Sequence, residues 1–165
     1  MISVVIPTHD DEAVLGRALG PLVSAAVTGL VREVILADGG SVDATLDIGE
    51  DAGCRIVAGE GSNEARARVA AEGAHSDWLM ILPPEVQLLP GWEGVVRGFV
   101  ERQSTASASL PPLDPDAGWL KRLMKRLLKR SCQPVIVVRK TAYLGGEHPP
   151  VRRMSGCAVV IGRVE

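Results

Sequence analysis

The sequence predicts an α/β fold in which a mostly parallel, Rossmann-like sheet is flanked by helices on both faces, giving three layers. Within residues 2–82, four apolar runs typical of strands alternate with three helical segments. Strands connected in this way pair in parallel through right-handed crossovers. In addition, 46% of the residues are hydrophobic but only 3% are aromatic, so Val, Leu, Ile and Ala must fill the core. Buried parallel strands under Ala- and Leu-rich helices have this composition.

In the first half of the chain, strands and helices follow one another in regular order. The strands are expected at residues 2–6, 32–38, 55–58 and 77–82, and the helices from about residue 11, at 43–52 and within 60–74. Pro21 is expected to kink or end the first helix. Ser41 or Asp43 is the expected cap of the second helix, and Ser62 or Asn63 that of the third.

The second half is less regular. A helix is expected at 90–102, a loop with one short strand at 104–115, a strand at 135–139, a turn at Gly145 and Gly146, and a last apolar run at 157–161. With 165 residues, the chain is expected to form a single domain around one substantial core.

Charge is distributed unevenly. Residues 1–118 carry 18 acidic and 7 basic side chains, a formal charge of −11, whereas residues 119–165 carry 2 acidic and 11 basic ones, a formal charge of +9. The first part therefore repels polyanions, and the second attracts an anionic partner. The acidic first part and the lack of aromatic residues for base stacking argue against nucleic-acid binding.

The three cysteines, Cys54, Cys132 and Cys157, are scattered and form no CxxC pair. They predict reduced thiols in a cytoplasmic protein, and neither a disulfide framework nor a zinc site. No basic or apolar leader is visible before the first predicted strand, so a signal peptide is not expected. No apolar run approaches the roughly 20 residues that span a bilayer, so any membrane contact is expected at the surface.

The stretch Val34–Thr45, VILADGGSVDAT, is where a ligand site is expected. Asp38 ends a predicted strand, and ligands of open α/β sheets bind beyond the carboxyl ends of such strands. A carboxylate there accepts hydrogen bonds from a ribose or a nucleobase, while Gly39 and Gly40 leave room for a close approach. The alternative is a strand-to-helix turn in which Asp38 is only a local cap.

Two motifs, SVVIPTHDDE at residues 3–12 and ADGGSVDAT at residues 37–45, precede an Ala-rich helix, a strand and PGW at residues 90–92. In this combination the chain resembles the family 2 glycosyltransferases of the GT-A fold, in particular their short bacterial members. The resemblance implies a GT-A-like sheet. It also implies transfer of a sugar, with inversion, from a UDP- or GDP-sugar donor to an acceptor.

The resemblance extends from Ile2 to about Trp92 and can be followed more weakly to about Gly146. It makes residues 1–92 the nucleotide-binding half of the domain and residues 93–165 the acceptor half. It also implies that the nucleotide lies at the ends of the first two strands. The residues so implied are Pro7, Thr8 and Asp10 for the base pocket, Asp38 for the base or ribose, and Gly39, Gly40, Ser41 and Asp43 for the adjoining loop.

The resemblance further implies that Arg66 or Arg68, in the Ala-rich helix, faces the diphosphate. Arginine suits this role because its guanidinium binds phosphate oxygens in a bidentate manner. The alternative is a solvated helix face on which the two arginines pair with Glu64 and Glu72.

The chain departs from the family pattern at the metal motif. The family places acidic ligands for a divalent cation directly after the fourth strand, where this chain has Pro83, Pro84 and Glu85. Glu85 is therefore the candidate ligand of Mg²⁺ or Mn²⁺, which phosphate oxygens and water would hold in the main. Such a site is weaker than one with paired carboxylates.

The second departure concerns the general base. After a Gly-Gly turn the family has a Glu-Asp pair, but here Gly146 is followed by EHPPVRR. Arginine cannot accept a proton at neutral pH, so Glu147 and His148 are the candidate bases. For His148 the alternative is a polar loop histidine without a catalytic role. If neither residue serves, the chain is a degenerate relative that binds a nucleotide or a membrane without catalysis.

Residues 119–130, WLKRLMKRLLKR, predict an amphipathic helix with one apolar and one basic face. Twelve helical residues reach about 18 Å and cannot cross a bilayer of roughly 30 Å. A helix of this kind can lie on an anionic membrane, here the cytoplasmic face of the inner membrane. The alternative is a helix docked on the domain's own core. The oligomeric state is left open by the sequence.

Overall fold

The computed structural model describes residues 1–102, 107–110, 134–146, 152–153 and 158–160. The predicted basic helix at 119–130 lies outside the described residues, as do Glu147, His148, Cys132 and Cys157.

The core of the fold is a seven-stranded sheet with the order β3-β2-β1-β4-β7-β6-β8. Its strands are β1 (Ile2–Thr8), β2 (Val31–Asp38), β3 (Arg55–Ala58), β4 (Trp78–Ile81), β6 (Ser107–Leu110), β7 (Val135–Arg139) and β8 (Arg152–Arg153). β7 pairs antiparallel with both of its neighbours, whereas the other pairs are parallel. A separate pair joins β5 (Val86–Leu88) to β9 (Ala158–Val160). The predicted mostly parallel sheet is confirmed, with β7 as the exception.

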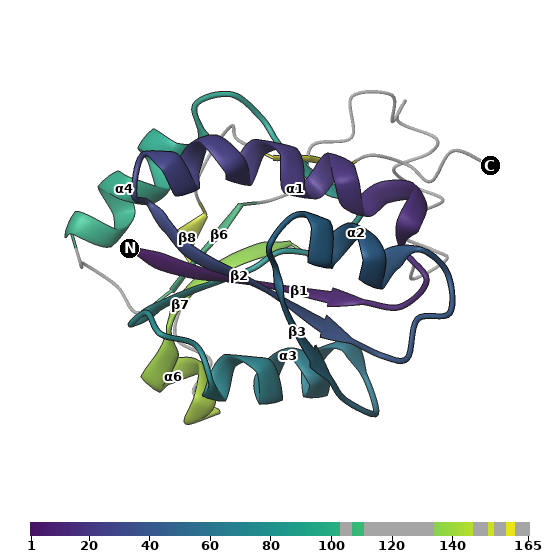
Figure 1. Ribbon diagram of the computed structural model, residues 1–165. Helices are drawn as coiled ribbons and strands as arrows, with labels where there is room; N and C mark the ends of the chain where they lie inside the picture. The colour runs from purple at the N-terminus through teal and green to yellow at the C-terminus, as the bar shows by residue number, and fades with distance from the viewer. Residues whose placement is uncertain (103–106, 111–133, 147–151, 154–157, 161–165) are drawn as a thin grey trace, which may run out of the picture.

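Helices cover both faces of the sheet (Figure 1). They are α1 (Glu12–Val27), α2 (Thr45–Asp51), α3 (Asn63–Glu72), α4 (Trp92–Arg102) and α6 (Lys140–Leu144). α1, α2 and α4 lie on one face, and α3 and α6 lie on the other. The three predicted layers are therefore present. No helix among the described residues is both long and apolar enough to cross a membrane.

Alternation along the strands divides the core into two parts, because successive side chains of a strand point to opposite faces. Val4, Ile6 and Met80 pack with apolar side chains of α1 and α4. Val5 and Leu79 pack instead with the alanines of α3 and with α6. The small alanine side chains let α3 lie close to the sheet, which brings its polar residues near the strand ends.

The elements differ from the predicted ones in a few places. Pro21 lies inside α1, which continues to Val27 because Leu22 and Ala25 beyond it are buried. α2 begins at Thr45 rather than at residue 43. The sequence pattern does not predict β5 or α6, since runs of three and five residues are too short to show a period.

Candidate functional site

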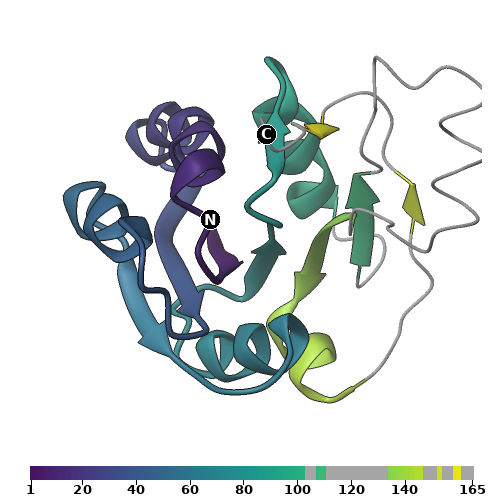
Figure 2. The same cartoon turned by 90° about the vertical axis from the view of Figure 1, so that its right-hand side faces the viewer.

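The candidate site lies where β1 and β2 end side by side. The two strands are parallel, and their register places Thr8 opposite Asp38. Both residues are buried, and the amide of Gly39 donates to the carbonyl oxygen of Thr8 at 2.9 Å. Figure 2 shows the molecule from the side toward which β1 and β2 point in Figure 1. Polar groups of both strand ends are therefore fixed at the edge of the sheet where ligands of such folds bind.

Asp38 accepts hydrogen bonds from four donors of its surroundings. The hydroxyls of Thr8 and Ser41 donate to its Oδ1 at 3.0 and 2.5 Å. The amides of Gly40 and Ser41 donate to its Oδ2 at 2.7 and 2.9 Å. Burial alone would raise the pKa of Asp38, but the hydrogen bonds, above all those from Ser41, outweigh it and lower the pKa below its ordinary value. Asp38 is therefore a carboxylate at neutral pH.

Through these hydrogen bonds Asp38 stabilises the turn that follows β2. An ionised carboxylate offers about four acceptor positions, and four donors of the chain already point at it. The turn that follows bends back over the carboxylate because Gly40 adopts a φ of +86°, a conformation that favours glycine. The predicted contact of Asp38 with a base or ribose stays a prediction. The structure shows the residue holding the Gly39–Ser41 turn in place.

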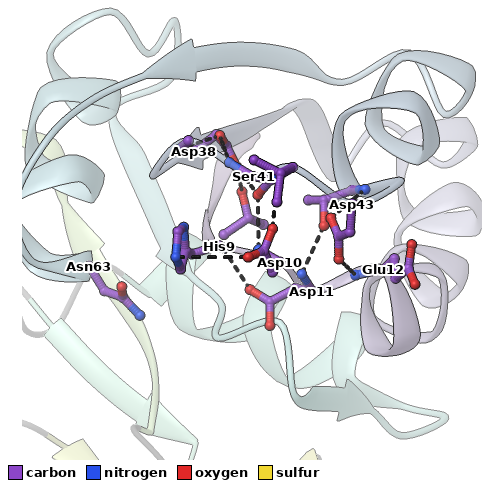
Figure 3. A network of polar contacts seen from close by, with 12 residues as sticks. His9, Asp10, Asp11, Glu12, Asp38, Ser41, Asp43 and Asn63 are labelled. Carbon is purple, nitrogen blue, oxygen red and sulfur yellow. Dashed lines mark hydrogen bonds and ion pairs between the residues drawn. The ribbon is translucent and has the colours of Figure 1, made fainter.

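The loops after β1 and β2 are joined by reciprocal hydrogen bonds (Figure 3). Backbone amides of Asp10, Asp11 and Glu12 donate to the side chains of Ser41, Thr45 and Asp43 at 3.0, 2.8 and 3.1 Å. In return, the amides of Val42 and Ala44 donate to the carboxylates of Asp10 and Glu12 at 2.8 and 2.9 Å. The two loops therefore form one rigid polar edge. Ser41 and Asp43, the expected caps of α2, both accept from this neighbouring loop, and Asp43 Oδ1 also accepts from the amide of Thr45, the first residue of α2, at 2.9 Å.

Among the residues predicted for the base pocket, Pro7 and Thr8 are buried within β1, whereas Asp10 is exposed. Asp10 has a φ of +53°, which is unusual outside glycine. Its backbone conformation turns the chain from β1 toward the second loop. His9, between them, is also exposed and lies 4.0 Å from the Asp10 carboxylate. His9 is not among the predicted site residues, although its place directly after the strand end was a usable signal.

Arg66 is almost fully buried, with 6% of its surface exposed. Its guanidinium donates to the carbonyl oxygens of Ala37, Gly61 and Thr8 at 3.3, 2.6 and 3.2 Å, and to Asn63 Oδ1 at 2.8 Å. These partners belong to the ends of β2 and β1, to the turn before α3, and to α3 itself. That Arg66 faces a diphosphate stays a prediction, and in the structure its donors bind three backbone carbonyls and one side-chain amide.

Arg68 lies on a different face of α3 and is exposed. It donates to the carbonyl oxygen of Leu144 at the end of α6. At the other end of the same contact, Lys140 Nζ donates to the carbonyl oxygens of Glu72 and Ala74 at 2.9 and 2.8 Å. Each of the two helices therefore places a cation at the carboxyl end of the other. The predicted diphosphate contact of Arg68 is untested, and its observed partner lies on α6.

Glu85, the candidate metal ligand, is half-buried in the turn between β4 and β5. The amide of Leu82 donates to the carbonyl oxygen of Val5 at 2.9 Å, so the chain after β4 continues beside the end of β1. Within the described ranges, no group of three or more His, Cys, Asp or Glu side chains is placed to hold a metal ion. The described residues therefore do not form a cage of protein ligands, and Glu85 as ligand of a cation held mainly by phosphate oxygens and water stays a prediction.

Sequence comparison relates the chain to known transferases. The sequence model of the family described as Glycosyl transferase family 2 matches residues 3–111. Polypeptide N-acetylgalactosaminyltransferase 8 of Drosophila melanogaster is 34% identical over an alignment of 120 positions, and the match covers 66% of this chain and 20% of that protein. This chain therefore spans only a fifth of the length of that relative.

Solved structures with a similar fold include two from bacteria. The crystal structure of S. aureus TarS in complex with UDP-GlcNAc is 13% identical, with a TM-score of 0.71, and the match covers 99% of this chain and 59% of that one. Glucosyl-3-phosphoglycerate synthase from Mycobacterium tuberculosis, in complex with Mn²⁺, UDP and phosphoglyceric acid, is 18% identical, with a TM-score of 0.60. That match covers 85% of this chain and 56% of the synthase chain. The predicted GT-A-like fold is confirmed.

Proposed function

The chain belongs to glycosyl transferase family 2, and from this premise we propose that it transfers a sugar from a nucleotide-sugar donor to an acceptor. The observation that carries the proposal is the rigid polar edge at the ends of β1 and β2. There a buried carboxylate, Asp38, fixes a glycine turn through four hydrogen bonds. A turn that is ordered before the ligand arrives lowers the entropy lost on binding.

We place the donor nucleotide along this edge. Its base and ribose would meet the exposed groups next to the strand ends, which are His9, Asp10 and the backbone of Gly40. Two solved structures of similar fold contain UDP or UDP-GlcNAc, which supports a uridine nucleotide, and a GDP-sugar is the other candidate. Pro7 and Thr8 support the pocket from within the sheet, since both are buried.

Glu85 is the proposed protein ligand of Mg²⁺ or Mn²⁺. When bound, such an ion neutralises the charge that develops on the leaving diphosphate. In the acceptor half, Glu147 or His148 is the proposed general base that takes the proton of the acceptor hydroxyl, because both side chains titrate in a usable range. The acceptor itself is unidentified.

The runner-up is a degenerate module that binds the nucleotide without catalysis. The substitution of the family's acidic ligands by Pro83 and Pro84 favours it. Release of UDP or GDP from sugar nucleotides, with water as a slow acceptor, distinguishes the two functions. We expect release in the wild type with Mn²⁺ and a loss of at least tenfold in Glu85→Gln, with Glu101→Gln on the exposed face of α4 as the control. Nucleotide binding without any release would overturn the proposed activity and leave the binding module.

We also propose that residues 119–130 bring the protein to the cytoplasmic face of an anionic membrane. The support is compositional: six basic residues and no acidic one share this stretch with a Trp and five large aliphatic residues. Each basic residue near an anionic surface contributes up to about 1 kcal/mol. We expect co-sedimentation with vesicles that contain phosphatidylserine, and its loss at high salt or in Lys121→Glu/Lys125→Glu/Lys129→Glu. Equal sedimentation with neutral vesicles would contradict the proposal.

A further inference from the structure

Arg66 is a buried cation with neutral partners. In the part of the chain that the structure describes, the ion pairs involve Glu33 and Asp10 and leave Arg66 out. Its four hydrogen-bond partners are three backbone carbonyls and one side-chain amide. Burying a charge without an anion is costly unless the hydrogen bonds replace its hydration. Because burying this charge is costly, we expect the hydrogen bonds of Arg66 to be needed by the protein.

The carbonyls that Arg66 binds belong to segments far apart in the sequence. Thr8 ends β1, Ala37 precedes the last residue of β2, and Gly61 lies in the turn that leads into α3. Thr8 is shared with the candidate site, because its hydroxyl donates to Asp38 while its carbonyl oxygen accepts from Arg66. Arg66 is therefore linked to the Asp38 carboxylate through a single intervening residue.

Gly39 is fitted to the guanidinium. A Cβ atom placed on Gly39 would lie 2.6 Å from Arg66 Cζ and 2.9 Å from both terminal nitrogens. Gly39 has no positive φ, so space and not backbone conformation requires a glycine there. At Gly40 the opposite holds: the φ is +86°, and a Cβ would meet nothing within 4 Å. A glycine is thus required at position 40 by the backbone conformation, and at position 39 by the space that the Arg66 guanidinium occupies.

We propose that Arg66 is a positioning residue for the nucleotide: by tying the carbonyls of Thr8, Ala37 and Gly61 together beneath Gly39, it holds the Gly39–Ser41 turn in the conformation that binds the donor, and it does not contact the donor's phosphates. The proposal rests on the proposed function and deepens it. In this proposal Arg66 acts on the donor indirectly, through the geometry of the turn. A direct electrostatic contact with the donor is disfavoured because the guanidinium is buried.

The two roles differ in what happens with ligands that carry no phosphate. If Arg66 acts through the turn, Arg66→Met weakens binding of uridine and of UDP by the same factor, at least tenfold. If Arg66 contacts the diphosphate, UDP binding falls and uridine binding does not. Arg66→Lys separates the roles again, because a lysine keeps the charge but has no planar fork for several separate acceptors. We expect Arg66→Lys to bind as poorly as Arg66→Met.

A double-mutant comparison tests the link to Gly39. We expect Gly39→Ala to weaken UDP binding because the new methyl group displaces the guanidinium. Gly39→Ala/Arg66→Met should bind no more weakly than Arg66→Met alone, since the clash is then absent. Additive losses would contradict the proposal. The control is Arg97→Met, which removes another arginine that donates to a carbonyl, that of Thr28 at 3.4 Å, and it should leave binding unchanged.

Binding is measured by calorimetric titration of uridine, UDP and GDP into the folded full chain. Amide hydrogen exchange of Gly40 and Ser41, whose amides donate to Asp38, is measured on the same variants. Faster exchange of these amides in Arg66→Met supports the positioning role, and unchanged exchange overturns it. If the wild type binds no nucleotide, the proposed function fails, while the exchange data still decide whether Arg66 holds the turn.

Discussion

The hydroxyl of Thr8 donates to the carboxylate of Asp38 at 3.0 Å, across the register of two parallel strands at the point where both end. Both side chains are buried, so the carboxylate is built into the edge of the sheet. Together with Arg66 beneath it and the glycine turn above it, this pair makes the edge rigid before any ligand binds.

Asp38→Asn should destabilise the protein. An asparagine amide would place an NH₂ group against amides or hydroxyls that now donate to Asp38, and a buried donor without an acceptor costs about 1–3 kcal/mol. Denaturant unfolding at neutral pH checks this prediction, with Glu50→Gln on the exposed side of α2 as the control. Equal unfolding free energies for wild type and Asp38→Asn would show that the four hydrogen bonds contribute nothing net.

Glu33, near the opposite end of β2, should make the free energy of unfolding depend on pH. Partial burial would raise the pKa of Glu33, but the hydrogen bonds from His75 and Ser3 and the charge of His75 lower it from 4.5 to about 2. Because the folded pKa is depressed, the stabilisation is complete above pH 4.5 and is lost as the pH falls toward 2. We expect the stability advantage of the wild type over Glu33→Gln to shrink across this range in urea titrations. Glu60→Gln, an exposed change, should show no such trend, and an advantage that does not vary with pH would refute the assignment.

Lys140→Met should loosen the contact between α3 and α6. The ammonium group serves two carbonyl oxygens at the carboxyl end of α3, and its loss should lower the unfolding free energy by about 1–2 kcal/mol. The amides of the last turn of α3 should also exchange faster with solvent. Arg17→Met, on the exposed side of α1, is the matched loss of a cation. Identical unfolding free energies of Lys140→Met and Arg17→Met would argue against a stabilising contact of Lys140 with the carboxyl end of α3.

Cys54 should react slowly in the folded protein. Burial raises the pKa of its thiol from 9.0 to about 11, so little thiolate is present at pH 8. Alkylation by iodoacetamide in Cys132→Ser/Cys157→Ser, where Cys54 is the remaining thiol, should accelerate strongly in urea. Rapid alkylation without urea would mean that the thiol is accessible and ionised in the native state.

The fold could be predicted largely from the sequence because the strand pattern is strong. The predicted strands at 55–58 and 135–139 coincide with β3 and β7, and Asp38 lies at the end of β2 as expected. α6 could not be predicted, because its five residues become helical through contacts with α3 that are distant in the sequence.

The position of Asp38 and of the glycine turn at the end of β2 could be predicted, but the hydrogen bonds around them could not. The motif located Asp38 and the glycine turn correctly, yet the hydrogen-bond partners of Asp10, Asp43 and Arg66 depend on how two loops and a helix meet. Local rules assign Asp43 to the start of a helix, and its Oδ1 does accept from the amide of Thr45, but they do not predict that its Oδ2 accepts from the amide of Glu12, which is 31 residues away. Arg66 is on a predicted helix, but only the packing of α3 against the sheet decides that it points inward.

If a nucleotide binds at the ends of β1 and β2, calorimetric titration of UDP, GDP and their sugar conjugates will detect it. The titrations compare wild type with Asp38→Ala, each with and without Mn²⁺, after circular dichroism has shown that both are folded. We predict saturable binding to the wild type and a loss of at least tenfold in the variant, because the turn over the carboxylate is released. Failure of every nucleotide to bind the wild type, or equal binding by Asp38→Ala, would contradict nucleotide binding at the ends of β1 and β2.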